Sequence, residues 1–219
     1  MATGIDQEKY YDNYWTTGIS QHSGENTGYA PNLKRWMDRE LKEIPAQSKI
    51  LEVGCGDASF TKNLVQYSSQ VTAIDISSAQ LDRNSETLPE VNFVQHDLSN
   101  SFPFKDNTFN VIWCSEVLEH LFSPNFALKE MFRVLCPQGR IMVTVPYHGL
   151  VKNLAIALFK WDHHFDPEYP HIRFFTKNTL SNLVKKAGFK EIEMSTCGMS
   201  KPLRDLLIPT NLLLKAKKV

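Results

Sequence analysis

The sequence has no excess of charge of either sign, no paired cysteine motif and no long apolar run. Lys and Arg total 24 and Asp and Glu also total 24, so the formal net charge of the 219 residues is zero. Phosphate contacts to nucleic acid normally need clustered Lys and Arg, and no basic run occurs in the sequence. We therefore expect no nucleic-acid partner, although a neutral chain can still carry a local basic patch.

Cysteine spacing and apolar run length exclude two further classes. Cys55, Cys114, Cys136 and Cys197 form no CxxC pair, which argues against zinc and redox motifs and favours reduced, mostly buried thiols. The first residues, MATGIDQEKYYDNYW, lack the apolar segment of a signal peptide. No apolar stretch approaches the roughly 20 residues that cross a bilayer. We expect a soluble cytoplasmic protein without membrane insertion.

What the sequence does contain is an alternation of strand-like and helix-like segments. Helical periodicity fills the gaps between five apolar runs of strand length: KILEVG, QVTAIDI, VNFVQHD, FNVIWCS and RIMVTVP. Parallel neighbours need crossover connections, so this alternation predicts an α/β fold with a doubly wound, mostly parallel sheet. One helix is expected to start at Ser123 and Pro124 and to stop at Gly139. No repeat or linker divides the chain, which predicts a single domain over residues 1–219.

After Pro146 the pattern changes. GLVKNLAIALFKW is an apolar helix candidate, TKNTLSNLVKKAGF a helix that ends at Gly188, and KEIEMSTC and TNLLLKAKK two more strands, the C-terminal one antiparallel. We interpret the first of these helices as a lid packed on the sheet. The alternative is an interfacial helix that touches a membrane, because Lys152, Lys160 and Trp161 suit an interface.

The stretch KILEVGCGDASF carries the strongest local signal. Gly54 and Gly56 follow a buried strand, where glycines of a parallel sheet let the backbone approach a ligand. Ser59 stands where the third glycine of a dinucleotide fingerprint belongs, which weakens a pyrophosphate site. No Lys-Ser or Lys-Thr follows the glycines, which excludes a P-loop. The ligand is therefore expected to lack a pyrophosphate.

Two acids complete this pattern. Asp75 ends the second strand, where a carboxylate can accept both ribose hydroxyls. Asp97 ends the third strand and can accept a hydrogen bond from an adenine amino group. Either acid alone could equally cap a turn or a helix. Both together, with the glycines, predict a nucleoside site.

The chain resembles the Rossmann-like S-adenosylmethionine-dependent methyltransferases, in particular the branch of the ubiquinone-biosynthesis O-methyltransferases. The resemblance runs from about Tyr10 onward, through the segments ILEVGCGDA, VTAIDIS, VQHDLSNSFPFKDNTFNVIWCSEVLEHL, ALKEMFRVLCPQGRIMVTVPY and HIRFFTKNTLSNLVKKAGF. It implies S-adenosyl-L-methionine as the cofactor. By position, it implies these cofactor-binding residues: Glu52, Gly54 and Gly56 at the methionine end, Asp75 with Ile76 at the ribose, Asp97 with Leu98 at the adenine, and Cys114 with Ser115 near the sulfonium.

Two positions depart from the family pattern. Ala58 replaces a common third glycine, and one methyl group is expected to fit the turn. Asn110 replaces the usual Asp of FDVI, and Asn can still bond the backbone there. The resemblance also suggests that the N-terminal aromatic residues Tyr10, Tyr11, Tyr14 and Trp15 close over the cofactor, with capping of the core as the alternative. Arg35 is interpreted as a solvated helix residue.

Histidines are the candidate bases for methyl transfer to a hydroxyl group. His120 in SEVLEH and His148 in VPYHG follow the fourth and fifth strands and so belong to the expected catalytic edge. His171 in HIRFFT is the third candidate. His120 could instead brace the helix start. His22 and His96 are interpreted as structural.

A sharper hypothesis joins Glu116, Glu119 and His120 with His171. The i,i+3 and i,i+4 spacings would let one helical turn aim the first three at one point. Two carboxylates and imidazole could hold a divalent ion that activates a vicinal diol. The arrangement resembles catechol and small-RNA ribose O-methyltransferases that use ExxEH with a later His. We do not expect a metal site as the primary interpretation.

The predicted function is methyl transfer from S-adenosylmethionine to an oxygen atom of a small-molecule acceptor. The compact insert after the fifth strand leaves little room for a macromolecule-binding domain, which favours a small acceptor. The first alternative is a metal-dependent RNA ribose O-methyltransferase, which formal neutrality disfavours. The second is a non-catalytic cofactor-binding partner subunit, which the intact glycines and acids disfavour. The sequence specifies neither the acceptor nor the oligomeric state.

Overall fold

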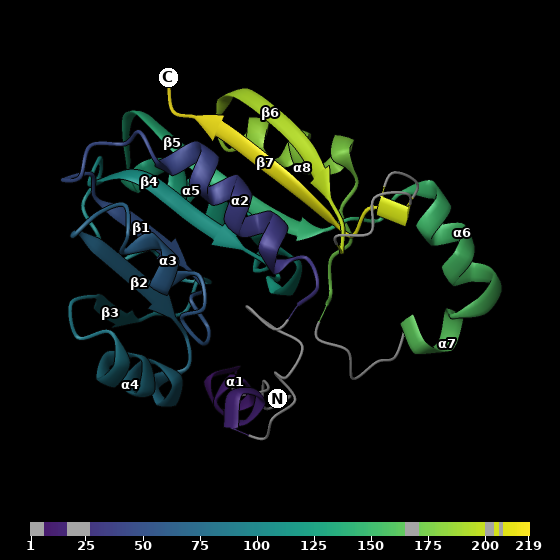
Figure 1. Cartoon of the computed structure of the whole chain (residues 1–219), viewed down its shortest axis with the longest axis horizontal. Coiled ribbons are helices and arrows are strands. Elements are labelled where there is room, and N and C mark those ends of the chain that lie inside the picture. Colours follow the sequence, from purple (N-terminus) through teal and green to yellow (C-terminus); the bar gives the residue numbers. More distant parts are fainter. Residues whose placement is uncertain (1–6, 17–26, 165–170, 200–203, 206–207) are drawn as a thin grey trace.

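A seven-stranded sheet forms the centre of the computed structural model (Figure 1), which describes residues 7–16, 27–164, 171–199, 204–205 and 208–219. The spatial order of the strands is β3-β2-β1-β4-β5-β7-β6. The strands are β1 (Ile50–Val53), β2 (Val71–Asp75), β3 (Asn92–Gln95), β4 (Phe109–Ser115), β5 (Leu135–Pro146), β6 (Lys190–Cys197) and β7 (Asn211–Lys217). The five strand-like runs and the two later strands predicted from the sequence are all present.

The pairing confirms the predicted fold class. The first five strands pair in parallel with their neighbours, whereas β7 runs antiparallel to both β5 and β6. The interior strands β1 and β4 are buried along almost their whole length, as expected for strands covered on both faces. The sheet is thus doubly wound and mostly parallel, with an antiparallel C-terminal strand.

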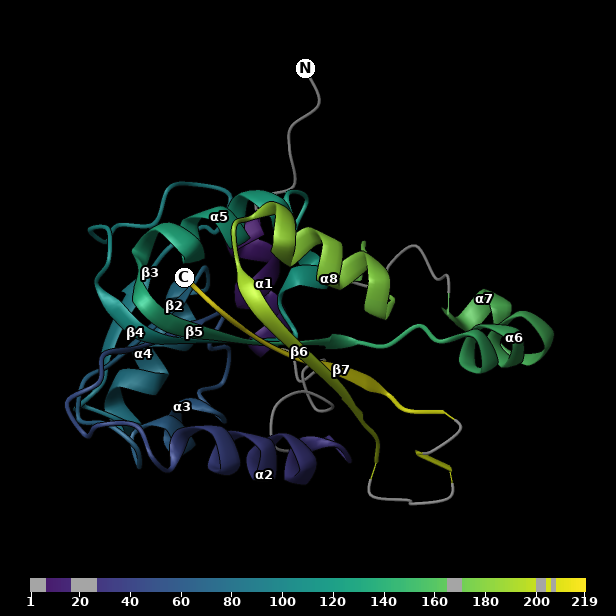
Figure 2. The ribbon, with the colours of Figure 1, turned by 90° about the horizontal axis from the view of Figure 1, so that it is seen from above.

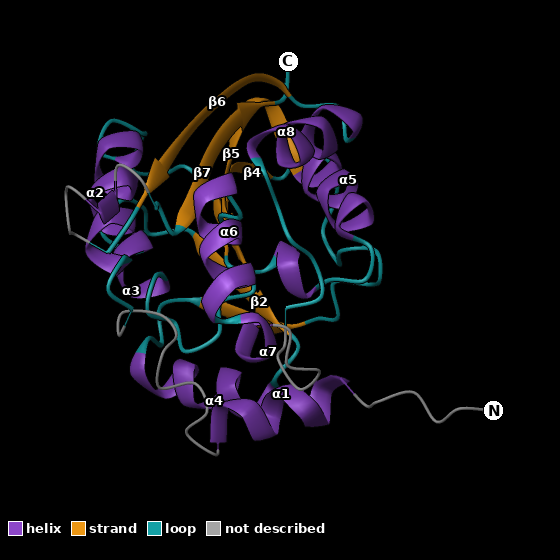
Figure 3. Ribbon diagram, turned by 90° about the vertical axis from the view of Figure 1, so that its right-hand side faces the viewer, coloured by secondary structure: helices purple, strands orange, loops and turns teal. Residues whose placement is uncertain are grey.

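Helices cover the two faces of the sheet separately. The helices are α1 (Gln7–Thr16), α2 (Ala30–Leu41), α3 (Thr61–Leu64), α4 (Ser78–Thr87), the 3-10 helix η3 (Leu118–His120), α5 (Pro124–Val134), α6 (Leu150–Phe159), α7 (Trp161–His164) and α8 (Lys177–Lys186). Apolar residues of α5 and α8 form one buried core with one face, and those of α2, α3 and α4 form a second core with the other. Figures 2 and 3 show these two layers on opposite sides of the sheet.

Asn110 behaves as predicted. Its side-chain oxygen accepts a hydrogen bond from the backbone N–H of Lys49 at 2.8 Å. The Asn110 N–H in turn donates to the Lys49 carbonyl at 2.8 Å. The amide therefore ties the entry of β4 to the entry of β1, as an aspartate at this position could also do.

The predicted end of helix α5 at Gly139 is wrong. The helix ends at Val134, and β5 begins at once with Leu135. Pro137 explains the early end, because a residue that precedes proline avoids the helical conformation and proline has no N–H to donate. Gly139 has a different role: a Cβ there would lie 2.8 Å from the Cys136 carbonyl oxygen, so the irregular start of β5 needs glycine.

The prediction that residues 149–161 form a lid packed on the sheet is half right. Helix α6 forms, but none of its residues is buried. Figures 1 and 2 show α6 and α7 beyond the carboxyl ends of the strands, away from the layers that cover the sheet. Among the described residues, no helix combines the length and the apolar character needed to span a bilayer.

The strand order places a ligand site between β1 and β4. From β1 the chain winds outward to β2 and β3 on one side, and later through β4 to β5 on the other. At such a switch point the loops after neighbouring strands diverge and leave a crevice at the carboxyl ends. The two loops concerned begin at Gly54 and at Glu116, and they contain the predicted residues Gly54, Gly56 and His120.

Candidate functional site

The loop after β1 needs glycine at two positions. Gly54 and Gly56 have φ of +72° and +48°, which is the left-handed region that favours glycine. A Cβ at Gly54 would overlap the Val117 side chain, and one at Gly56 would lie 2.6 Å from the Trp15 ring. Ala58 adopts φ of +59° without being glycine, and its methyl group is fully buried. The methyl group fits the turn as predicted, but the residue is in a strained conformation.

Asp75 connects this loop to the start of α4. One carboxylate oxygen accepts the Gly56 N–H at 2.9 Å and the other accepts the Ser77 N–H at 3.1 Å. Burial raises the pKa of Asp75, while these backbone hydrogen bonds act in the opposite direction. The Ile76 N–H also bonds Asp75, and since a carboxylate offers about four acceptor positions, some capacity remains for a ribose hydroxyl group. The backbone approach at Gly54 and Gly56 and the remaining acceptor capacity of Asp75 both fit a nucleoside.

The structure places Ile76 directly after β2, and the adenine-side residues Asp97 and Leu98 just after β3. Asp97 accepts the Ser99 N–H at 2.8 Å, so it caps a turn, and its side chain is still partly exposed. Leu98 packs against the larger core. The Ile76 carbonyl accepts a hydrogen bond from the Gln95 side chain at 3.2 Å. His96 contacts the ring of Phe102 edge-on, which agrees with a structural role.

Glu52 lies inside β1 and is almost completely buried. The Thr61 hydroxyl donates a hydrogen bond to its carboxyl group at 2.5 Å. Burial raises the pKa of Glu52 to about 8, with Thr61 acting in the opposite direction. Thr61 is the first residue of α3 and follows the glycine loop, so its hydrogen bond to Glu52 holds the end of that loop against β1. A direct contact with the methionine end of the cofactor stays a prediction.

A chain of hydrogen bonds follows β4. Cys114 is fully buried. The Ser115 and Thr144 hydroxyl oxygens lie 2.7 Å apart, and Thr144 donates to a Glu116 carboxylate oxygen at 2.7 Å. Since the single proton of Thr144 is used in this way, Ser115 must be the donor to Thr144. The order Ser115 to Thr144 to Glu116 fixes the crevice side of β4 and β5.

The predicted helical turn that joins Glu116 to His120 is wrong. Glu116 has φ of +56°, so it cannot belong to a right-handed helix. Helical structure begins only at Leu118, as the short 3-10 segment η3. The Glu116 carboxylate consequently bonds Thr144 and lies outside the set of side chains that converge on a common point, which is Glu119, His120 and His171.

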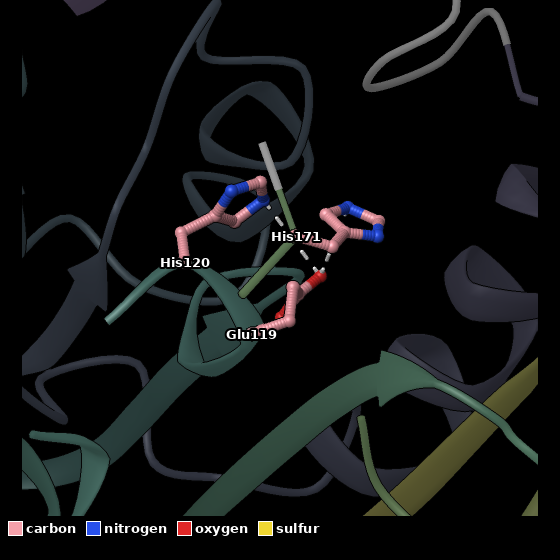
Figure 4. A group of neighbouring side chains, drawn as sticks. All are labelled: Glu119, His120 and His171. Atoms are coloured by element: carbon pink, nitrogen blue, oxygen red, sulfur yellow. Dashed lines mark ion pairs between the residues drawn. The ribbon is translucent and has the colours of Figure 1, made fainter. Parts of the chain in front are cut away.

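Glu119, His120 and His171 form the most unusual group of the site (Figure 4). Both imidazole Nε2 atoms lie 3.9 Å from the same Glu119 oxygen, Oε1, and the two ring centroids are 4.8 Å apart. The Glu119 side chain is fully buried, whereas each histidine side chain is 20% exposed. Among the described residues, neither Glu119 oxygen has a hydrogen-bond partner. Burial raises the pKa of Glu119 well above its usual range, and the nearby Glu116 adds to this effect.

Backbone contacts explain why His171 reaches this group. The N–H groups of Ile172 and Arg173 both donate to the Glu119 carbonyl at 3.0 Å. The Arg173 side chain also donates to the Phe122 carbonyl at 2.8 Å. The segment before α8 is therefore fixed directly on the loop after β4, although the two are far apart in sequence. Spacing alone could not have shown this contact.

His148 is separate from that group. It is buried, contacts the Phe174 ring at 4.8 Å, and lies 3.4 Å from the Asn153 side-chain oxygen through Nδ1. Its N–H donates to the Phe175 carbonyl, which joins the end of β5 to the segment before α8. These contacts give it a bracing position beside the crevice. A catalytic role for His148 stays a prediction.

Helix α1 covers part of the crevice. The Tyr11 ring meets His120 edge-on with centroids 6.3 Å apart, and the Trp15 ring lies over Gly56. Asp12, which the sequence did not single out, accepts the Ser77 hydroxyl at 2.5 Å and the Ala79 N–H at 3.3 Å. It thus anchors α1 on the start of α4. Arg35 is exposed, as predicted, and His22 lies outside the described residues.

Tyr29 is a second residue that sequence reasoning missed. Its side chain is half-buried, and desolvation raises the pKa of its phenol far above the usual value, with Glu116 and Glu119 adding to the rise. Tyr29 also bonds Glu116, as do Thr144 and Asn211. An isolated tyrosine before a predicted helix gives no sequence signal of this role.

Comparison with known proteins gives consistent matches. A family model described as a methyltransferase domain matches residues 27–193. An O-methyltransferase, cnsE, of Penicillium expansum is 29% identical over 197 residues, which cover 83% of this chain and 65% of the relative. The 2-methyl-6-phytyl-1,4-hydroquinone methyltransferase of Synechocystis is 29% identical and covers 74% of this chain and 52% of the relative. The chain thus spans less than two thirds of either relative.

The fold has close structural neighbours as well. An S-adenosylmethionine dependent methyltransferase from Mesorhizobium loti superposes with a TM-score of 0.67 and 18% sequence identity. The match covers 88% of this chain and 99% of that structure. At this identity the likeness supports the fold alone.

Proposed function

Because the chain belongs to the methyltransferase domain family, we propose that it transfers a methyl group from S-adenosylmethionine to an oxygen atom of a small-molecule acceptor. The cofactor supplies an electrophilic methyl group. One relative is an O-methyltransferase, which supports oxygen as the target. Another is named for a phytyl hydroquinone, which supports a small-molecule acceptor but does not identify the methylated atom. Membership of the ubiquinone-biosynthesis branch and cytoplasmic location stay predictions.

One observation carries the proposal: two imidazole groups meet a buried carboxylate at the switch point. A hydroxyl group must lose its proton as the new bond to carbon forms, and an imidazole near neutral pKa is suited to accept it. His120 and His171 are partly exposed and lie at the crevice, so either can reach an acceptor. Glu119, at 3.9 Å from both, would orient the imidazole groups.

The cofactor-binding residues would be those predicted from the sequence. Gly54 and Gly56 would let the backbone approach the methionine end, and Asp75 would bond the ribose hydroxyl groups. Ile76 would lie beside Asp75, Asp97 and Leu98 would contact the base, and Cys114 and Ser115 would lie beside the reacting methyl group. Three of these assignments rest on geometry already described: the two glycines with positive φ, and the acceptor capacity that remains at Asp75.

The same three side chains could instead hold a divalent ion. One carboxylate and two imidazoles, with ligand atoms within 4.8 Å of one another, are a suitable donor set. An ion would lower the pKa of a bound hydroxyl group and orient a vicinal diol. The two mechanisms differ in their response to chelation, which an assay can measure directly.

The test is transfer of radiolabelled methyl from S-adenosylmethionine to paired acceptors. Catechol and hydroquinone would be compared with the corresponding aminophenol and diamine, in EDTA and in added Mg²⁺. Methyl incorporation into hydroxyl groups that persists in EDTA is expected. Dependence on Mg²⁺ would favour the ion. Incorporation only into nitrogen would contradict O-methylation, and cofactor binding without any transfer would favour a non-catalytic subunit.

A further inference from the structure

A cavity of about 310 Å³ lies between the start of α6 and the carboxyl ends of β5 and β6. Its polar lining comes from Tyr147 after β5, Lys152 in α6, Lys177 in α8 and Thr196 in β6. We call this cavity the α6 pocket. An apolar cavity of about 150 Å³ can bind benzene, so the α6 pocket has room for a ring that carries a substituent.

The polar groups of the α6 pocket are hydrogen-bond donors. The ammonium groups of Lys152 and Lys177 only donate, and the hydroxyl groups of Tyr147 and Thr196 can donate as well. Among the described residues that line the pocket there is no Asp or Glu. Such a lining complements an oxyanion, that is, a carboxylate or a phosphate group.

The two lysines of the pocket lack a counter-charge in direct contact. Lys42, Lys215 and Lys217 each pair with a glutamate, whereas Lys152 and Lys177 have no ion-pair partner within the described part of the chain. Lys152 is half-buried, and burial lowers the pKa of its ammonium group. A partly buried charge without a partner is costly, and a bound oxyanion would supply the missing partner.

Glu116 is the acid that acts on Lys152, but it does not occupy the pocket. Its charge raises the pKa of Lys152 without an ion pair between the two side chains. The Glu116 carboxylate already accepts hydrogen bonds from Thr144, Asn211 and Tyr29. It does not belong to the lining of the pocket. The Lys152 ammonium group therefore remains available to a ligand.

The rest of the lining is largely apolar. Leu150, Val151, Ile208 and Pro209 contribute to it. Leu150 and Val151 are 84% and 50% exposed, and no residue of α6 is buried. A ligand that covers these side chains would remove apolar surface from water, which is favourable. The pocket thus suits an oxyanion on an organic skeleton better than a free inorganic anion.

The α6 pocket adjoins the proposed site of proton transfer. The segment that begins with His171 continues to Lys177, and Phe175 within it forms a β-bridge with Tyr147. Glu119 follows β4, and Tyr147 follows the neighbouring strand β5. Neighbouring strands lie about 4.8 Å apart. One molecule with a single ring can therefore place a hydroxyl group at the imidazoles and an oxyanion in the pocket.

The carboxylate of the cofactor is a competing occupant of the pocket. Its predicted position is beside Gly54 and Gly56, which follow β1. The pocket is lined from β5 and β6, which lie two and four strands away from β1. These separations correspond to about 10 and 19 Å. The pocket therefore belongs to the acceptor half of the crevice.

We propose that the α6 pocket binds a carboxylate or phosphate group of the acceptor, so that the acceptor is a hydroxylated organic anion. Lys152 and Lys177 pair with the oxyanion, Tyr147 and Thr196 donate hydrogen bonds to it, and the apolar walls contact the skeleton. The pocket selects acceptors by charge and fixes the hydroxyl group relative to the imidazoles. This assignment rests on the proposed O-methylation, but binding of the anion can be measured without methyl transfer.

The first experiment is calorimetric binding of three ligands to the 219-residue chain saturated with S-adenosylhomocysteine. The ligands are hydrocinnamate, its neutral amide and phenyl phosphate, none of which has a hydroxyl group on its ring. The test variant is Lys152→Met with Lys177→Met. The matched control is Lys160→Met with Lys185→Met, which removes exposed lysines from the ends of the same two helices. Lys177→Met alone changes an exposed side chain and so tests the pocket without a risk to folding.

The wild type and the control variant should bind hydrocinnamate at least about tenfold more tightly than its amide. The double variant should lose this difference, and Lys177→Met should lose part of it. The tighter of the two anions identifies the oxyanion as carboxylate or phosphate, and either result supports the pocket. Equal binding of acid and amide to the wild type, or an equal loss in the control variant, would overturn the proposal. Inorganic phosphate that binds as tightly as the organic anions would also overturn it.

A second experiment separates this proposal from the proposed function. Methyl transfer to dihydrocaffeate is compared with transfer to its uncharged methyl ester. In the wild type the KM of the acid should be at least about tenfold lower than that of the ester, and in the double variant the two values should be nearly equal. Equal KM values in the wild type would overturn the pocket and support O-methylation. Anion binding as expected, without transfer to either hydroxylated compound, would support the pocket and contradict O-methylation.

Discussion

The two halves of the crevice are built in opposite ways. In the cofactor half, formed by the loops after β1, β2 and β3, the acid Asp75 has backbone partners. In the acceptor half, formed by the segments after β4 and β5 and before α8, Glu119 is buried without a hydrogen-bond partner among the described residues. The first half is complete as a folded structure. The second contains Glu119, whose burial lowers the stability of the fold, so we expect this residue to serve the reaction and not the fold.

This difference has a physical meaning. Groups that hold a cofactor can also stabilise the fold, because backbone amides orient them before the ligand binds. A group that moves protons must keep some of its hydrogen-bonding positions unoccupied. A buried polar group with unoccupied hydrogen-bonding positions destabilises the folded protein. A substitution in the cofactor half should therefore weaken cofactor binding. A substitution in the acceptor half should lower activity while it increases stability.

The largest effect is expected in the cofactor half. Asp75→Ala removes the acceptor of the Gly56 and Ser77 N–H groups and leaves both donors buried. We expect S-adenosylmethionine affinity to fall at least about hundredfold, since the ribose acceptor and the loop geometry are lost together. Titration calorimetry measures the affinity. Asp97→Ala, which removes a partly exposed turn cap, should cost clearly less, and equal losses in the two variants would contradict this ranking.

Glu119→Met should show the opposite combination. Activity should fall about hundredfold, because the imidazole groups lose the carboxylate that orients them. The free energy of unfolding should rise by about 1–3 kcal/mol, because an apolar side chain of similar size replaces a buried acid that has no hydrogen-bond partner among the described residues. Methyl-transfer kinetics and urea unfolding of the same preparation measure both quantities.

Glu130→Met is the matched control for this substitution. Glu130 accepts the Phe102 N–H at 2.7 Å and pairs with Arg133 at 2.7 Å. Removing it should lower stability by about 1–2 kcal/mol and leave activity unchanged. If Glu119→Met were as destabilising as Glu130→Met, Glu119 would be an ordinary structural acid.

The cofactor half was largely predictable from the sequence, because its signals are local. Gly54, Gly56 and Asp75 follow their strands directly, and strand order in a parallel sheet brings such positions together. The backbone hydrogen bond of Asn110 could also be predicted from its position in the sequence. The environment of Glu52 could not, because its bond to Thr61 depends on how α3 packs under the loop.

The acceptor half was predictable only in part. Glu119, His120 and His171 were grouped by a resemblance, and the structure brings them together. Glu116 was placed wrongly because its left-handed backbone conformation breaks the helical spacing that was assumed. The lid was placed wrongly because an apolar helix pattern does not reveal what covers the apolar face. Periodicity specifies an element, but its partner depends on tertiary structure.

Glu52, a buried acid of the cofactor half, should make the free energy of unfolding depend on pH. Burial raises the pKa of Glu52 from 4.5 to about 8. Between these values the unfolded chain releases a proton that the folded chain keeps, so stability falls as pH rises through this window. The slope for one proton is about 1.4 kcal/mol per pH unit.

Comparison of Glu52→Gln with the wild type isolates this contribution. Urea unfolding at pH 5 and pH 7.5 should show that the wild type loses about 2–3 kcal/mol more than the variant over this range. Glutamine can still accept the Thr61 hydrogen bond but does not titrate. Parallel pH profiles of the two proteins would show that Glu52 is already ionised in the folded chain.

The smallest effect is expected at Ala58, which lies between the loop that contains Gly54 and Gly56 and the buried start of α3. Its φ of +59° is costly for alanine and free for glycine. Ala58→Gly should raise the free energy of unfolding by up to about 1 kcal/mol, because relief of strain exceeds the loss of one buried methyl group. The matched change Ala127→Gly, at a fully buried position of α5, should lower it by about 1 kcal/mol or more. Both substitutions delete one methyl group, so changes of opposite sign in the free energy of unfolding would establish that the cofactor loop stores strain. Equal losses would show that packing of the Ala58 methyl group outweighs the cost of its backbone conformation.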